Sequence, residues 1–95
     1  MALWSLFVEV GDERYNTQVT AESPRSAVEA LLASRGFGDV LANLSKKGWP
    51  SSFASEDIIL LMPMDGLINM HLCQLGKAGN YVSLVMARTE PVAHV

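Results

Sequence analysis

The sequence carries little charge and almost no cysteine. Aspartate, glutamate, lysine and arginine make up 18% of its 95 residues, and ten acidic against seven basic side chains give a formal net charge of −3. Because broad nucleic-acid binding usually needs a basic surface, this balance argues against nucleic acid as a partner. Cys73 is the single cysteine, which excludes a disulfide within the chain and favours a reducing, cytoplasmic location.

Long apolar runs and common catalytic motifs are also absent. No stretch approaches the roughly 18 apolar residues that a membrane-spanning helix needs. The apolar start MALWSLFVEV lacks the positive charges that open a signal peptide. The sequence contains no P-loop and no GxGxxG, GxSxG, HExxH or CxxC motif. We therefore expect a cytoplasmic protein without a cofactor or a membrane partner, which acts by association rather than as an enzyme.

The remaining composition is typical of a folded globular protein, since 49% of the residues are apolar. A chain of this length has room for one hydrophobic core. We expect a single domain over residues 1–90. Residues 91–95 follow no apolar pattern and are predicted to form a disordered or loosely attached tail.

The first half of the sequence predicts a hairpin and two helices. The even positions of 3–10 are apolar, and Tyr15, Thr17, Val19 and Ala21 alternate with more polar residues. The segment GDER at 11–14 between them is typical of a turn. Ser23 and Pro24 have the residue types that begin a helix, which we expect to end before Gly36. A second, shorter helix is predicted from an Asp39 cap to Gly48.

The second half predicts three strands joined by tight turns. Alternating or continuous apolar runs cover 58–64, 67–75 and 81–88. Asp65-Gly66 joins the first two runs and is a strong short hairpin signal. The order β-β-α-α-β-β-β predicts an α+β domain: an antiparallel sheet of about five strands, with two short helices inserted after the first hairpin.

A two-residue turn at Asp65-Gly66 would determine which side chains share a face of the sheet. One side would then be wholly apolar and would form the core, with Ile59, Leu61, Pro63, Ile68, Met70 and Leu72. The other side would be mixed, with Ile58, Leu60, Met62, Met64, Leu67, Asn69, His71 and Cys73. Leu3, Phe7, Tyr81, Val85 and Ala87 give the first and last strands a similar mixed face.

This second face is more apolar than a sheet surface open to water usually is. Either one helix packs on each side of the sheet, or another protein covers the second face. The sequence thus predicts a homodimer, or a complex with a protein partner, formed through one sheet face. The predicted contact residues are Leu60, Met62, Met64, Asn69 and His71.

Two alternatives remain open. His71 and Cys73 project to the same side of a strand, and a metal or catalytic site could be completed across a dimer. A histidine beside a buried thiol is the plainer interpretation. Lys46, Lys47 and Trp49 could form a weak nucleic-acid surface. The plainer interpretation is that the two lysines lie at the end of a helix and that Trp49 covers the edge of the core.

Overall fold

The predicted first hairpin is present in the computed structural model, which describes residues 1–89. Strands β1 (Ala2–Val10) and β2 (Glu13–Ala21) pair over their full length in antiparallel register. Gly11 at the turn has a φ of 61°, which glycine adopts at little cost. The tail predicted for 91–95, and the last residue of the predicted domain, lie outside the described residues.

One antiparallel sheet of five strands forms the body of the protein. After the helices, β3 (Ile58–Pro63), β4 (Met70–Lys77) and β5 (Asn80–Thr89) follow, and the strand order is β2-β1-β5-β4-β3. The predicted α+β class and element order are confirmed. A short 3-10 helix, η1 (Ser55–Asp57), precedes β3 in the predicted loop.

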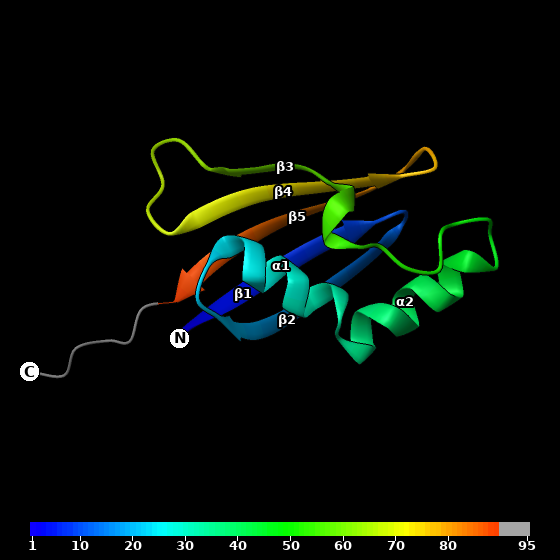
Figure 1. The fold of residues 1–95 in the computed structure, drawn as a ribbon, viewed down its shortest axis with the longest axis horizontal. Helices are drawn as coiled ribbons and strands as arrows, with labels where there is room; N and C mark the ends of the chain where they lie inside the picture. Colours follow the sequence, from blue (N-terminus) through cyan, green and yellow to red (C-terminus); the bar gives the residue numbers. More distant parts are fainter. Residues whose placement is uncertain (90–95) are drawn as a thin grey trace, which may run out of the picture.

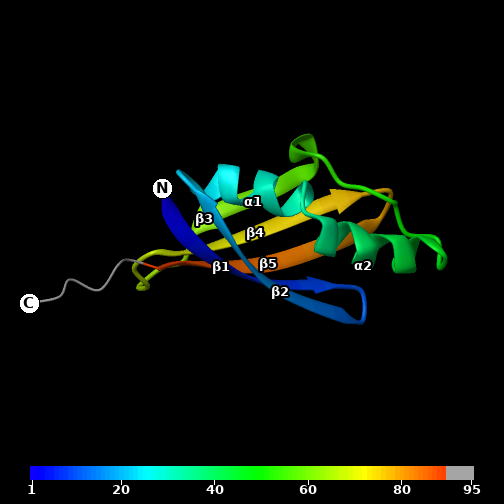
Figure 2. The same cartoon turned by 90° about the horizontal axis from the view of Figure 1, so that it is seen from below.

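Both helices, α1 (Pro24–Leu32) and α2 (Arg35–Ser45), lie on the same side of the sheet, as Figures 1 and 2 show. We call this side the helix face and the other side the open face. Of the two alternatives for the second face, the one with a helix on each side of the sheet is therefore excluded. None of the helices in residues 1–89 is long and apolar enough to cross a membrane.

The helix boundary differs from the predicted one. Ser23 caps α1 as expected and accepts a hydrogen bond from the Ser26 amide. The break, however, falls at Ala33 and Ser34, and Ser34 rather than Asp39 is the N-cap of the second helix. Gly36 thus lies in the first turn of α2, where its missing side chain lets the Tyr15 ring pack directly on the helix.

The core lies between the sheet and the two helices. Trp4, Leu6, Val8 and Val10 of β1 are buried there, which confirms the predicted alternation of that strand. Val82, Leu84 and Met86 of β5 also face the helices, together with Cys73 and Leu75 of β4. The helices contribute Ala27, Val28, Leu31, Phe37, Leu41 and Leu44.

The predicted register of β3 and β4 is wrong. The two strands are joined by a loop over 64–69 rather than by a two-residue turn, and Asn69 in this loop has a φ of 64°. His71 lies opposite Pro63, not Leu60, and Leu72 lies opposite Met62. This is an odd shift, so every side chain of β4 faces the side opposite to the predicted one.

The correction moves several named residues. Met70 and Leu72, predicted in the core, lie on the open face, and Ile59 is 57% exposed at an irregularity in β3. Leu61 keeps its predicted place on the helix face, opposite Cys73. Ile58 joins Leu61 there and packs on the core.

Candidate interaction surface

The five predicted contact residues do not share one face. Leu60 and Met62 lie on the open face, opposite Gln74 and Leu72. Met64 and Asn69 belong to the loop between β3 and β4. His71 points to the helix face, since it shares the alternation of Cys73. The candidate surface is therefore the open face without His71.

The open face is broadly apolar across four strands. Phe7 on β1 lies beside Val85 on β5, which lies beside Leu72 on β4, which lies beside Met62 on β3. This row crosses the sheet, and Phe7 and Met62 are 49% and 43% exposed. Further apolar side chains on the same face are Leu3, Leu60, Met70, Tyr81 and Ala87.

Very few charges lie on this face. Among the described strand residues, only Glu9 and Arg14 bring charged side chains to it, and they lie in one corner with their closest charged atoms 3.9 Å apart. Ser5, Asn16, Gln18, Thr20, Ser83 and Gln74 supply uncharged polar groups. A sheet face that serves only as a solvated surface normally carries more charge than this, whereas the centre of a protein interface is depleted of it.

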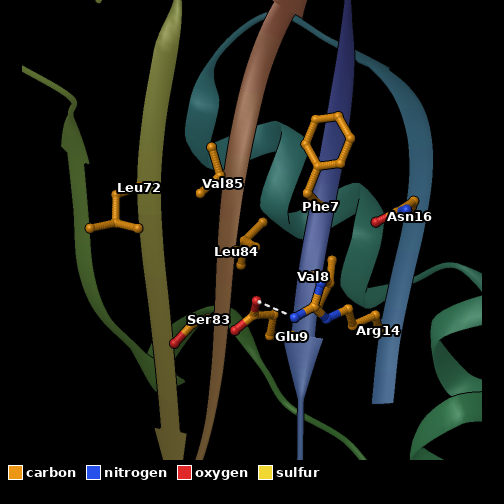
Figure 3. A pocket seen from close by; sticks show the side chains of 9 residues that line it. All are labelled: Phe7, Val8, Glu9, Arg14, Asn16, Leu72, Ser83, Leu84 and Val85. Carbon is orange, nitrogen blue, oxygen red and sulfur yellow. Dashed lines mark ion pairs between the residues drawn. The ribbon is translucent and has the colours of Figure 1, made fainter. Parts of the chain in front are cut away.

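The middle of the open face is hollowed. Figure 3 shows the side chains of Phe7, Leu72 and Val85 around a shallow hollow of about 370 Å³, with Asn16 and the Arg14–Glu9 pair at one side. The twist of the five-stranded sheet gives this surface its curvature.

His71 and Cys73 form no site on the open face. The His71 ring packs edge-on against Trp4, with ring centroids 5.7 Å apart, and its Nδ1 atom is buried without a hydrogen-bond partner. Burial raises the pKa of the Cys73 thiol to about 11, although the nearby Arg25 charge lowers it. A thiol with this pKa is protonated and unreactive at neutral pH. No group of three potential metal ligands occurs within residues 1–89.

Lys46, Lys47 and Trp49 lie at the end of α2. Both lysine side chains are exposed, while Trp49 is partly buried and packs on the core beside Gly11. The indole therefore covers one end of the core, as the plainer interpretation of this segment expected. A ring in that place is not presented to a base, which weakens the case for stacking on nucleic acid.

Leu72 and Met70 are residues of the open face that the sequence pattern placed in the core. One signal in the sequence could have identified them. On β4, Gln74 alternates with Cys73 and Leu75, so its polar side chain marks the even positions of the strand as the side away from the core.

Comparison with known proteins adds no function to this picture. No family model, no curated protein and no solved structure matches the chain. The open face and the strands that carry it are therefore the basis on which a function can be assigned.

Proposed function

We propose that this protein works by self-association, and that two copies pack together through their open sheet faces. The observation that carries the proposal is the apolar row Phe7, Val85, Leu72 and Met62, which lies on the side of the sheet that no helix covers. Burying such a row removes apolar area from water and favours association.

The lack of net charge on the open face supports a second copy as the partner. In a two-fold contact, the same surface patch of each copy faces its counterpart on the other copy. A strongly charged face would repel itself. Here the Glu9 and Arg14 charges cancel, so two open faces can approach without a net electrostatic penalty.

The size of the face also fits a stable pair. Five strands at a spacing of about 4.8 Å, each about eight residues long at about 3.3 Å per residue, give a face of roughly 600 Å². Two such faces bury roughly 1,200 Å², which is at the lower end of the range for specific protein interfaces. Two packed sheets would form a sandwich with an apolar interior.

The test is the mass in solution, measured by light scattering over a range of concentrations. Phe7→Glu places a charge in the middle of the proposed contact, on a side chain that is 49% exposed in a single copy. We expect this variant to have half the mass of the wild type and an unchanged circular dichroism spectrum. Met62→Glu, at the other end of the apolar row, should act in the same direction.

The matched control is Ala42→Glu. This exposed site on α2 receives the same charge on the opposite side of the protein, and the mass should not change. The proposal fails if Phe7→Glu and Met62→Glu keep the wild-type mass. It also fails if either variant unfolds a protein that is already monomeric, since the face would then be part of the core.

A further inference from the structure

The two edges of the sheet differ in how well they are protected against pairing with another strand. On the β3 edge, the strand has six residues, its register is broken between Ile58 and Leu60, and it ends at Pro63. Short length, irregular pairing and proline are the usual means by which proteins block an exposed edge. The β3 edge is therefore a poor template for a further strand.

The β2 edge has none of these features. It runs for nine residues in unbroken register with β1, and it contains no proline, glycine or lysine. Residues 15–21 are uncharged, and Tyr15, Thr17, Val19 and Thr20 are residue types that favour strands. Such an edge is open to pairing.

The turn between β1 and β2 determines which backbone amide and carbonyl groups of β2 are free to bond to another strand. Val10 and Glu13 close a two-residue turn and form a hydrogen-bonded pair, so the odd residues of β2 bond to β1. The amide and carbonyl groups of Arg14, Asn16, Gln18 and Thr20 then point away from the sheet. Within residues 1–89, β1 is the only strand that pairs with β2.

From this asymmetry we infer that β2 is a second contact surface, which pairs antiparallel with β2 of another copy to make a continuous sheet of ten strands. A two-fold axis normal to the sheet relates the two strands, so each offers the other the same row of amide and carbonyl groups. This contact uses the edge of the sheet and is independent of the open-face contact.

Charge favours one register for this pairing. With Gln18 on the two-fold axis, Asn16 of each copy lies opposite Thr20 of the other, and Arg14 comes next to Glu22, the first residue after the end of β2. Opposite charges then flank both ends of the new strand pair, and no like charges face each other within it. Opposite charges across a strand pair are stabilising.

The edge and face contacts can coexist. The axis of the edge contact is normal to the sheet, whereas the axis of the face contact lies between the two sheets and parallel to them. If the face axis runs across the strands and meets the edge axis, the two perpendicular axes generate a closed tetramer, a common symmetry among soluble oligomers. A protein that makes both contacts should therefore have four times the 10.3 kDa mass of one chain.

The first test removes one backbone donor at the centre of the edge. Gln18→Pro deletes an amide that points away from β1, and Gln18→Ala is the matched control, since both lose the side-chain hydrogen bond to Ser5. We expect Gln18→Pro alone to halve the mass measured by light scattering. Equal masses for the two variants overturn the inference, provided that circular dichroism shows Gln18→Pro to be folded.

The second test does not depend on how the proline variant folds. Cys73 is fully buried, so Gln18→Cys introduces the one exposed thiol. Facing residues of a hydrogen-bonded pair have Cα atoms about 5.5 Å apart, which a disulfide can span. Gln18→Cys should form a covalent dimer under mild oxidation. Asn16→Cys should not, since its two thiols would lie about 13 Å apart along the strands. No dimer from Gln18→Cys, or equal yields from both variants, overturns the inference.

The same measurements separate the two contacts. If only the edge contact exists, Phe7→Glu leaves the mass unchanged while Gln18→Pro yields a monomer. If only the face contact exists, Phe7→Glu yields a monomer while Gln18→Pro leaves the mass unchanged and Gln18→Cys gives no covalent dimer. With both contacts, each single variant is a dimer and the double variant is a monomer.

Discussion

Truncation of Phe7 should weaken self-association with little effect on the fold of one copy. The ring is 49% exposed, and a phenylalanine side chain presents roughly 200 Å² in total, so the contact would bury about 100 Å² per copy. At about 25 cal/mol per Å², and with allowance for the methyl group that remains, Phe7→Ala loses about 2 kcal/mol for each copy. A two-fold contact loses about 4 kcal/mol, which raises the dissociation constant roughly a thousandfold.

Leu6 provides the matched comparison, because it is the neighbouring residue on β1 and points to the opposite face. Its side chain is 0% exposed, so Leu6→Ala should lower the free energy of unfolding of one copy by about 2–5 kcal/mol. Sedimentation equilibrium gives the dissociation constant, and urea unfolding at a concentration below that constant gives the stability of a single copy. The reasoning is refuted if Phe7→Ala changes the dissociation constant by less than about tenfold, or if it destabilises a single copy as much as Leu6→Ala does.

Three further predictions concern stability. Gly36→Ala would place a Cβ atom 2.9 Å from Cζ of Tyr15, and the crowding should cost about 1–3 kcal/mol in urea unfolding. Ala78 has a φ of 52° in the turn between β4 and β5, so Ala78→Asn should raise the free energy of unfolding by about 1 kcal/mol by relieving this strain. Because burial raises the pKa of Cys73 from 9.0 to about 11, the folded state holds the thiol proton more tightly, and stability should fall between pH 9 and pH 11. Cys73→Ala should lack that part of the pH dependence, and the native Cys73 thiol should resist alkylation at pH 7 until the protein unfolds.

The sheet itself could be predicted because its strands alternate strongly. On β1, four large apolar side chains at even positions specify the buried side whatever the neighbouring strands do. The start of the first helix could be predicted from local signals, since Ser23 and Pro24 are residue types typical of a helix start. The boundary between the two helices could not be predicted, because Ser34 and Asp39 are equally suitable N-cap residues. Gly36 was also misleading as an end signal, since it lies inside α2 where the Tyr15 ring packs on the helix.

The register of β3 and β4 could not be predicted, because it depends on contacts that are not local. Asp65-Gly66 is a strong hairpin signal, yet the chain makes a longer loop. The Met64 amide donates to the Met70 carbonyl across its base, and the Asn69 carbonyl accepts a bond from the Arg88 amide of β5. The second of these bonds joins the loop to a strand that is close in space but distant in the sequence. Local turn chemistry therefore competes here with pairing to β5.

The difference between the predicted and the observed register leaves the open face in the same place on β3 but changes which β4 side chains lie on it. Leu60 and Met62 stay on it, because their side of β3 does not depend on the loop, while Leu72 and Gln74 of β4 replace His71 and Cys73. The face thus gains an apolar side chain and loses both groups that could bind a metal or act as a nucleophile. Since these two groups lie on the helix face, a second copy seated on the open face cannot approach them. Association through the open face and chemistry at His71 and Cys73 therefore use opposite sides of the sheet. Of the two, only association has a matching exposed surface among residues 1–89, the apolar open face.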